Sequence, residues 1–528
     1  LEVRLQARRP LAGRADPERG SRPAGAELDA EQAAAFSAVR EAIDSGRAET
    51  ILLEGDTASG KTAVYAEAIA HALAVGRGAL VLVPEIALAI PLIDRLRHDL
   101  GVEPALLHSA LGEGERADEW RRVRRGDASV VVGTRMAVLS PPEPLGLVVV
   151  DEEHDPAYKS DRTPRYQGRD VAVALGRLAQ APVVLGSATP DIVSVGRARA
   201  GEIRQLHLRG RRSGRPVTVA VADLREELAE GNRGLISTPL AAALQALDTD
   251  AGDRAILLIN RRGAASVVLC RDCGYVQICP ECQRPLVFHA SVVALRCHHC
   301  GASAPVAKRC PACESVRIRY LGGGTERVQQ ELAVRFPQLR VSRLDRDVVE
   351  RKGAAARVID DFTAGASDVL VGTSLVAKGL DIPEVTLMGV VSADIALNLP
   401  DERAAERTWQ LLTQAVGRAG RGDRPGRAIV QTYQPEHPAI EAVARGQAGP
   451  FIEAELERRR RFGSPPFGRL IKLTVALPDR DAAEEAASGM VARLRERSEE
   501  LEARVSVLGP VPAYICLLYT SPSPRDWI

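Results

Sequence analysis

Eight of the nine cysteines of this chain lie close together in the sequence as four Cys-x-x-Cys pairs. Four such pairs supply eight thiolates, and a structural zinc ion takes four thiolates in a tetrahedron. We expect no signal peptide, and clustered pairs of this kind then favour zinc in a reducing cytosol over disulfide bonds. The sequence therefore predicts two zinc sites, built from Cys270, Cys273, Cys279, Cys282, Cys297, Cys300, Cys310 and Cys313.

The spacing of the pairs favours a nested arrangement, although sequential and crossed pairings are also compatible with the sequence. A site closed by four thiolates leaves no position for water or substrate, so both sites are expected to be structural. In the nested arrangement the outer set is Cys270, Cys273, Cys310 and Cys313, and the inner set is Cys279, Cys282, Cys297 and Cys300.

The charges of the chain balance almost completely, with 70 basic against 69 acidic side chains and a formal net charge of +1. This balance excludes a uniformly basic surface for nucleic acid, so phosphate groups must be bound by local patches. At about 100–200 residues per domain, the 528 residues predict roughly three to five domains. No apolar run approaches the roughly 18–20 residues that a membrane span needs.

Short apolar runs alternate with helical patterns along most of the chain. A helix is expected to begin near Asp29, where apolar residues recur at helical spacing. Continuous Val/Leu runs that alternate with helices indicate parallel sheets covered on both faces. One series of runs comprises Ile51–Leu53, Ala79–Val83, Val130–Val132, Leu147–Val150 and Val183–Leu185, and a second comprises Ile256–Ile259, Val369–Val371, Leu387–Val391 and Ala428–Val430.

The two series predict two α/β halves, with the cysteine block inserted into the second half. After His437 the pattern changes to a charged helix over Glu453–Arg461, a Pro-Pro turn and a strand-like run over Leu470–Ala476. This change predicts a smaller α+β domain in the carboxyl-terminal part of the chain.

A phosphate-binding loop follows the first apolar run. Its sequence fits G-x-x-x-x-G-K-[ST], follows a predicted strand and opens a predicted helix. Glycines let backbone N–H groups approach phosphates closely, and the start of a helix adds a favourable dipole. Lys61 is expected to reach the β- and γ-phosphates of ATP, and Thr62 to bind Mg²⁺. The loop comprises Gly55, Asp56, Thr57, Ala58, Ser59, Gly60, Lys61 and Thr62.

Two carboxylates directly follow a predicted strand of the first half. Asp151 is expected to hold the Mg²⁺ shell, and Glu152 to activate the attacking water. In the second half, the segment that starts at Gln414 carries Arg418 and Arg421, which are expected to stabilise charge on the transferred phosphoryl group. An arginine-glycine segment by itself is more often a solvated turn.

The order of these motifs resembles that of superfamily 2 DEAD/DEAH-type helicases, and more narrowly that of the PriA family of replication-restart helicases. The resemblance covers about Leu28 to Ile515, and the cysteine insertion is its most family-specific feature. The ordered motifs are the phosphate loop, Asp151–His154, Gly186–Pro190 and Gln414–Arg421, and further matching segments are Val83–Leu88, Leu107–Ser109, Val132–Arg135, Asn260–Gly263, Gly323–Glu326, Ala377–Gly379 and Pro400-Asp401.

The resemblance implies two RecA-like P-loop lobes, a nested two-zinc insertion in the second lobe and a small α+β carboxyl-terminal domain. Relatives also carry an amino-terminal DNA-binding domain and a winged-helix domain, and neither appears before Leu28. Because the chain starts without a methionine and Leu517–Ile528 continues no earlier pattern, we expect truncation at both ends and a foreign tail. The expected boundaries are 1–27 for a linker or remnant, 28–205 for lobe 1, 206–269 and 317–436 for lobe 2, 270–316 for the zinc insertion, 437–515 for the carboxyl-terminal domain and 516–528 for a foreign tail.

The same resemblance assigns roles to residues that composition and spacing do not single out. Gln32 is implied to read the adenine, although by itself it is compatible with a surface helix position. Ser187 and Thr189 are implied to link hydrolysis to strand movement. Gly379 and Asp381 are implied to contact the nucleotide and the DNA backbone.

The segment after the acidic motif interleaves aromatic and cationic side chains. Bases stack on tyrosine, and cations hold phosphates. In the family, the corresponding loop senses single-stranded DNA and triggers ATP hydrolysis, whereas the residues alone are also compatible with an ordinary solvated loop. The residues concerned are Tyr158, Lys159, Arg162, Arg165, Tyr166 and Arg169.

The resemblance implies an ATP-dependent 3′→5′ DNA helicase that restarts replication at stalled or abandoned forks by unwinding and by primosome assembly. The alternatives are an ATP-independent fork-binding scaffold that recruits the loader of the replicative helicase, and an RNA-directed motor. The complete hydrolytic set favours an enzyme over a scaffold.

The cofactors expected from these motifs are ATP, Mg²⁺ and two Zn²⁺. The expected partners are forked and single-stranded DNA, primosome and loader proteins, and single-strand-binding protein, with no membrane. A monomer in the bacterial cytoplasm, associated with the nucleoid, is expected.

Overall fold

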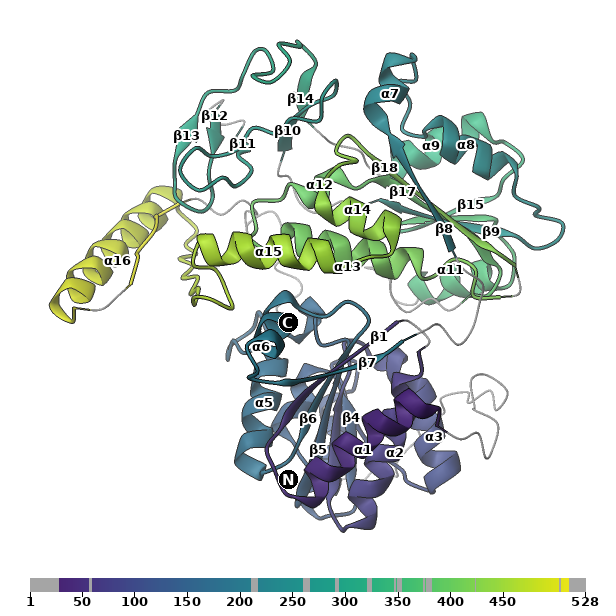
Figure 1. Ribbon diagram of the computed structural model, residues 1–528, viewed down its shortest axis with the longest axis vertical. Coiled ribbons are helices and arrows are strands. Elements are labelled where there is room, and N and C mark those ends of the chain that lie inside the picture. The colour runs from purple at the N-terminus through teal and green to yellow at the C-terminus, as the bar shows by residue number, and fades with distance from the viewer. Residues whose placement is uncertain are drawn as a thin grey trace, which may run out of the picture. The chain divides into compact units, whose positions relative to one another are not determined.

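The structure is a computed structural model that describes residues 28–56, 59–209, 217–259, 266–289, 294–320, 325–345, 348, 354–373, 376, 382–422, 424–502 and 505–511. The chain forms two compact units, Leu1–Arg212 and Ser213–Ile528 (Figure 1). Several predicted segments lie outside the described part: the linker 1–27, Thr57 and Ala58 of the phosphate loop, Asn260–Gly263, Gly323-Gly324, Ala377–Gly379, Asp381 and the proposed tail 516–528.

The first unit is built on a seven-stranded parallel sheet with the strand order β3-β4-β2-β5-β6-β1-β7. The Val/Leu runs form its central strands, and every residue of β2 and β4 is buried. The strands are β1 (Thr50–Gly55), β2 (Gly78–Leu82), β3 (Ala105–Leu107), β4 (Val130–Gly133), β5 (Leu145–Asp151), β6 (Val183–Ser187) and β7 (Arg204–Leu208).

Helices cover this sheet, and three of them pack into one core with its strands. Val39 of α1, Ile69 of α2 and Leu96 of α3 lie in that core with Ile51 and Val81. The helices are α1 (Ala30–Asp44), α2 (Lys61–Ala74), α3 (Ile90–Leu100), α4 (Glu113–Arg124), α5 (Gly168–Ala179) and α6 (Ile192–Arg199), with short 3-10 helices η1 (Ile86–Ala89), η2 (Arg135–Leu139) and η3 (Pro156–Tyr158).

The second unit contains a six-stranded parallel sheet with the order β15-β16-β9-β17-β18-β8. Its strands are β8 (Val217–Asp223), β9 (Arg254–Ile259), β15 (Val341–Leu344), β16 (Val369–Gly372), β17 (Val385–Ser392) and β18 (Gly426–Thr432). Its helices are α7 (Leu224–Ala229), α8 (Thr238–Gln245), α9 (Thr325–Arg335), α11 (Ala354–Thr363), α12 (Asp394–Leu397), α13 (Ala404–Val416), α14 (Pro438–Arg445) and α15 (Gly449–Arg461). The prediction of two parallel-sheet α/β lobes is confirmed.

The cysteine block forms a separate antiparallel sheet between β9 and α9 in the chain, as the insertion prediction required. Its strand order is β13-β12-β11-β10-β14. The strands are β10 (Ser266–Cys270), β11 (Val287–His289), β12 (Ala294–Arg296), β13 (Ser303–Ala304) and β14 (Ile318–Tyr320).

The predicted strand over Leu470–Ala476 is wrong, because residues 469–477 have no strand structure. A strand needs a hydrogen-bonding partner, and no strand of the described chain pairs with this run; Ile471 is 86% exposed. The helix that follows, α16 (Arg480–Glu500), has no buried residue. Among the described helices, none is both long enough and apolar enough to cross a membrane.

A buried cluster of charges joins α13 to α15. Arg459 of α15, whose side chain is only 2% exposed, donates to Glu455 at 2.8 Å and to Glu406 of α13 at 2.8 Å. Arg403 pairs with the same Glu406 at 2.9 Å. Buried charges are tolerated only when they are paired and hydrogen-bonded. The predicted charged helix is α15, and it therefore buries one charged face against α13, the helix that contains Gln414.

Candidate functional site

The phosphate loop connects the end of β1 to the start of α2. A Cβ at Gly55 would lie 2.5 Å from Ser59 Oγ and 3.0 Å from Leu208 Cβ, so a side chain there would have to displace both neighbours. Gly60, which precedes the first residue of α2, has a φ of +88°, a conformation that side chains disfavour. Asp56 and Thr62 are exposed beside this turn. The loop therefore has the tight backbone that a phosphate cradle requires.

Lys61 is buried at the first position of α2. Its ammonium donates to the backbone oxygens of Gly55 at 2.6 Å and Asp56 at 3.3 Å, so it is held directly over the loop. The hydroxyl of Ser59 is buried and has no hydrogen-bond partner. Phosphate oxygens are bound by groups of this kind: a hydroxyl that lacks a partner, a lysine ammonium and the free N–H groups at the start of a helix. These residues fit the phosphates of ATP.

Gln32 lies on α1 next to this loop and is completely buried, so it is not a surface residue. Its amide donates to the backbone oxygens of Ser59 at 3.1 Å and Gly60 at 3.4 Å. Its backbone N–H donates to the carboxylate of Asp29 at 2.7 Å, in a capping box that starts α1 at the predicted place. The amide of Gln32 is thereby fixed against the phosphate loop.

Asp151 ends β5 and faces α2. One of its carboxylate oxygens accepts a hydrogen bond from the hydroxyl of Tyr65 at 2.9 Å. Burial raises the pKa of Asp151 to about 6, and the negative charge of Glu152 acts in the same direction, while the Lys61 ammonium opposes both. A divalent cation favours the ionised form of a carboxylate. Asp151 is therefore a fitting ligand for Mg²⁺.

Glu152 is placed by a strained backbone. Its φ is +46°, which is uncommon for a residue with a side chain and is found at functional sites. Its Oε2 atom is buried and has no hydrogen-bond partner. That atom lies 3.6 Å from Nδ1 of His154, beyond hydrogen-bond range. A fixed carboxylate oxygen that lacks a donor is suited to accept a proton from water.

His154 joins the acidic motif to the end of β6. Its Nδ1 atom lies 2.7 Å from the hydroxyl of Ser187, and its Nε2 atom lies 3.4 Å from the hydroxyl of Thr189. The backbone N–H of Thr189 also donates to the Ser187 hydroxyl at 3.0 Å. All three side chains are buried. The two predicted coupling residues are therefore in direct contact with the acidic motif.

The loop after the acidic motif is partly exposed and partly structural. Lys159, Arg162 and Arg165 are exposed, as a DNA-contacting loop requires. Tyr166 is partly buried, and its hydroxyl donates to the backbone oxygen of Arg135 at 3.2 Å.

Tyr158 and Arg169 of this loop do not support the predicted DNA-contacting role. Tyr158 is 0% exposed, so its ring offers no surface for stacking, and its hydroxyl donates to the backbone oxygens of Asp151 and Leu82. Arg169 pairs with Glu153 at 2.9 Å and with Asp191 at 3.0 Å. Both side chains hold the acidic motif in place instead.

Gln414, Arg418 and Arg421 lie at the end of α13 and in the turn that follows it, in the second unit. The guanidinium of Arg421 donates to the backbone oxygen of Gly417 at 3.2 Å, which holds it against the turn. The three side chains are partly buried. The segment thus places both arginines in the turn that directly follows α13.

The eight clustered cysteines form two groups of four, in the nested arrangement. Within each group the sulfur atoms lie within 4.8 Å of one another. In the outer group, Cys270 and Cys313 are 3.7 Å apart; in the inner group, Cys282 and Cys297 are 3.4 Å apart. The outer group is Cys270, Cys273, Cys310 and Cys313, and the inner group is Cys279, Cys282, Cys297 and Cys300.

The chemistry of these sulfur groups fits zinc. Burial, together with hydrogen bonds from neighbouring cysteines, raises the pKa of Cys273 to about 12, and burial also raises the pKa of Cys282. Four thiols this close ionise together only when a cation compensates their charge. Zinc takes four thiolates at about 2.3 Å in a tetrahedron, which these two groups can supply. Both centres therefore suit a closed structural zinc ion.

Three buried residues of the site were not singled out from the sequence, namely Tyr65, Glu153 and Asp191. Tyr65 contacts Asp151, while Glu153 accepts from the backbone N–H of Asp191 at 2.7 Å and from the hydroxyl of Ser194 at 3.0 Å. The available signal for Tyr65 was its position one helical turn after Lys61, in a chain with only 3% aromatic residues. For Glu153 and Asp191 no local pattern existed, because their contact joins distant segments.

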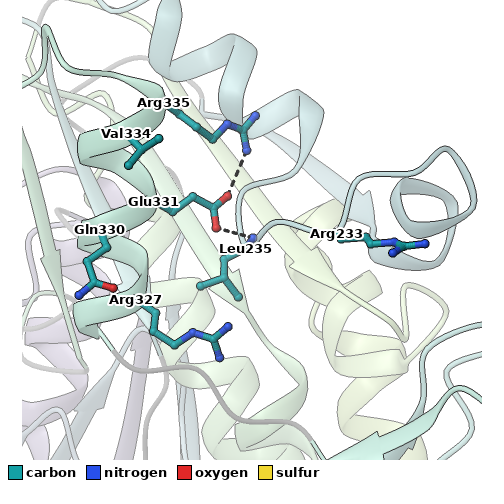
Figure 2. A pocket seen from close by; sticks show the side chains of 7 residues that line it. All are labelled: Arg233, Leu235, Arg327, Gln330, Glu331, Val334 and Arg335. Carbon is teal, nitrogen blue, oxygen red and sulfur yellow. Dashed lines mark hydrogen bonds and ion pairs between the residues drawn. The ribbon is translucent and has the colours of Figure 1, made fainter.

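A shallow hollow of about 360 Å³ lies on the second unit between α9 and the loop before α8 (Figure 2). Glu331 connects its two sides: it accepts from the backbone N–H of Leu235 at 2.8 Å and pairs with Arg335 at 3.1 Å. Among the described residues, none forms a hydrogen bond or ion pair with the guanidinium of Arg233 or Arg327. Three arginines against one glutamate make the lining basic; the full lining is Arg233, Leu235, Arg327, Gln330, Glu331, Val334 and Arg335.

Three family models match the chain. The model of the DEAD/DEAH box helicase matches residues 30–197, and that of the helicase conserved C-terminal domain matches residues 320–423. The model of the PriA DNA helicase Cys-rich region (CRR) domain matches residues 279–305, which include the inner group of cysteines. These matches cover the phosphate loop, the acidic motif and the segment with Arg418 and Arg421.

Curated relatives named replication restart protein PriA match most of the chain. That of Bacillus subtilis is 44% identical over 451 residues, which are 85% of this chain and 56% of the relative. That of Synechocystis is 43% identical over 88% of this chain and 57% of the relative. That of Treponema pallidum is 38% identical over 90% of this chain and 72% of the relative. The chain thus spans little more than half the length of the first two relatives.

Solved structures resemble the chain more distantly. RecG bound to a three-way DNA junction shares 17% identity over 83% of this chain and 50% of that chain, with a TM-score of 0.46. The DUF1998 helicase MrfA bound to DNA shares 15% identity over 81% of this chain and 49% of that chain, with a TM-score of 0.45.

Proposed function

The chain belongs to the family of the replication restart protein PriA, and we propose that it is a DNA-dependent ATPase and 3′→5′ DNA helicase that acts at stalled or abandoned replication forks. The observation that carries the proposal is the buried oxygen of Glu152 without a donor, next to Asp151 and in the same unit as Lys61. A protein that only binds forks has no need for a strained carboxylate at this place.

Hydrolysis is assigned to residues of the first unit. Lys61, Ser59 and the amide groups at the start of α2 hold the phosphates, and Gln32 reads the adenine by family resemblance. Thr62 and Asp151 hold Mg²⁺. Glu152 orients the attacking water toward the γ-phosphorus and accepts a proton from that water. When bound, ATP with Mg²⁺ supplies the phosphoryl group and the positive charge that neutralises its oxygens.

The contacts of His154 suit a relay between hydrolysis and movement. Its ring touches Ser187 and Thr189 at the end of β6, so a shift of the acidic motif must move that strand end as well. In the second unit we assign Arg418 and Arg421 to stabilise the charge of the transition state, as the family resemblance implies. Gln414, Gly379 and Asp381 are assigned to the same nucleotide site on the same ground.

The two zinc centres are proposed to be structural and to hold a module that helps divide DNA strands and bind primosome proteins. Neither closed four-thiolate group offers a position for water. Loader proteins and single-strand-binding protein are the proposed partners, and the bacterial cytoplasm at the nucleoid is the proposed place of action. Partner choice rests on the family alone.

The test is ATP hydrolysis measured with and without single-stranded DNA, followed by strand displacement on duplexes that carry either a 3′ or a 5′ single-stranded tail. We expect DNA to stimulate hydrolysis, and only the 3′-tailed duplex to be unwound, in a manner that requires ATP. Fork binding without any hydrolysis would favour the alternative of an ATP-independent scaffold. Equal stimulation by RNA would favour an RNA-directed motor.

The exposed cations of the loop after the acidic motif are expected to contribute to DNA binding. Replacing Lys159, Arg162 and Arg165 by alanine should lower the salt dependence of binding to single-stranded DNA, by up to about 0.7 in the log–log slope for each lost phosphate contact. Fluorescence anisotropy over a series of salt concentrations measures this slope.

The basic hollow of the second unit supplies the control for that experiment. The double variant Arg233→Ala and Arg327→Ala removes two cations outside the loop, and we expect it to leave the slope unchanged. A loop variant with the slope of the parent protein would contradict the assignment. If only the hollow variant had a reduced slope, we would infer instead that single-stranded DNA binds along α9.

A further inference from the structure

Tyr65 is a buried tyrosine whose hydroxyl meets the hydrolytic site. It lies in the second turn of α2, one helical turn after Lys61, and is 2% exposed. Its hydroxyl donates to Oδ1 of Asp151 at 2.9 Å. An ionised carboxylate oxygen can only accept, so the tyrosine hydroxyl is the donor in this contact.

The end of β6 makes room for this contact. Gly186 lies directly opposite Asp151 in the pairing of β5 with β6. A Cβ built on Gly186 would overlap the Tyr65 hydroxyl and would lie 3.4 Å from Oδ1 of Asp151. Any larger residue at position 186 must therefore displace the tyrosine. Three segments that are distant in the sequence meet at one hydrogen bond: the phosphate-loop helix, the acidic motif and the segment Gly186–Pro190.

The contact constrains the carboxylate of Asp151 rather than its backbone. Buried hydroxyl groups need a partner, and the side chain of Asp151 is the partner of Tyr65 among the described residues. A carboxylate that binds a metal is commonly oriented by a second group that holds its other oxygen. With Oδ1 held by Tyr65, the orientation of the second oxygen is restricted.

We propose that Tyr65 is a positioning residue, which holds the carboxylate of Asp151 in the orientation that binds Mg²⁺ with the nucleotide, and that Gly186 is required because it accommodates this tyrosine. The inference rests on the proposed ATPase function. It goes beyond that function, because it makes the affinity of the site for Mg²⁺ depend on Tyr65, which touches neither the nucleotide nor the metal.

The test is the affinity of the Tyr65→Phe variant for Mn²⁺ in the presence of ADP, measured by electron paramagnetic resonance. Loss of a group that orients a metal ligand typically weakens metal binding by about 10–100-fold, and we expect a loss in that range. Binding of fluorescent ADP in the presence of a chelator should stay at the level of the parent protein, because the phosphate loop is intact.

Tyr158→Phe is the matched control. Tyr158 is also completely buried next to Asp151, but its hydroxyl donates to backbone oxygens, those of Asp151 at 2.5 Å and Leu82 at 3.0 Å. We expect this variant to lower the melting temperature with a much smaller change in Mn²⁺ affinity. Equal losses of Mn²⁺ affinity in both variants would overturn the proposal, because the carboxylate contact would then not be the cause.

Gly186→Ala provides a second, independent variant. The added methyl group displaces the Tyr65 hydroxyl, so Mn²⁺ affinity should fall as it does in Tyr65→Phe. The double variant, which lacks that hydroxyl, should lose no more affinity than either single variant. Tyr65→Phe with parental Mn²⁺ affinity overturns the inference alone, whereas a parent protein that does not bind Mn²⁺ with ADP overturns the proposed function.

Discussion

Replacement of Lys61 by alanine is expected to abolish ATP hydrolysis, with a loss of at least about a hundredfold, while binding of single-stranded DNA persists. Removing one group that stabilises developing charge typically costs about 10²–10³ in rate. Lys61 is held over the phosphate loop by two backbone oxygens, at 2.6 and 3.3 Å, and its ammonium is the group that reaches the β- and γ-phosphates. Steady-state release of phosphate with saturating DNA measures the effect.

Two further measurements separate this loss from damage to the fold. Lys61 is buried, so the melting temperature of the variant must be compared with that of the parent protein. Lys472→Ala removes the same charge from an exposed position outside both sheets and should hydrolyse ATP at the parental rate. Hydrolysis that survives in a folded Lys61→Ala variant would show that the nucleotide site is assigned wrongly.

The parallel sheets could be predicted because their strands are buried on both faces. Runs such as Val130–Val132 and Leu147–Val150 are apolar at every position. A strand that is covered on both faces has such a continuous apolar sequence instead of alternating apolar and polar residues, so it can be recognised locally. The phosphate loop could be predicted for a similar reason, since glycine positions, lysine and threonine are dictated by local backbone geometry and phosphate chemistry.

Features that depend on contacts between distant segments could not be predicted. The alternation of Leu470–Ala476 is that of a strand, but strand formation needs a partner that no local pattern supplies. The run of α15 was predicted only as a charged helix, and its pattern does not reveal that Arg459 is buried, because the partner that neutralises it, Glu406, lies on another helix. Tyr158 looked like a stacking residue in an exposed loop, and its burial depends on two backbone oxygens of neighbouring strands.

The cysteine groups lie between these two cases. Ligand type and number follow from the four Cys-x-x-Cys pairs, so two zinc centres could be predicted from the sequence alone. The choice among nested, sequential and crossed pairing needed the fold. In the structure, β11 and β12 pair with each other in register, and this hairpin leads from Cys282 to Cys297, so the inner pairs meet across it.

Replacement of Cys279 by serine is expected to release one of two zinc ions and to impair unwinding more than ATP turnover. Cys279 is 0% exposed and lies in a small core with Leu286 and Leu295, so the inner group supports the packing of the module. Structural zinc supplies apparent binding free energies of about 10–16 kcal/mol, which is more than so small a core provides alone. The hydrolytic residues Lys61 and Asp151 belong to the other unit and should be affected less.

Zinc content, measured by atomic absorption on freshly purified protein, decides between the outcomes. We expect two zinc ions per chain in the parent protein, one in Cys279→Ser and two in Cys516→Ser, which removes the cysteine that belongs to none of the four Cys-x-x-Cys pairs. Retention of two ions in Cys279→Ser would contradict the inner site, and a parent protein without zinc would contradict both. If Cys279→Ser loses one ion but unwinds at the parental rate, the module is a binding platform rather than a part of the motor, because unwinding would then not depend on its fold.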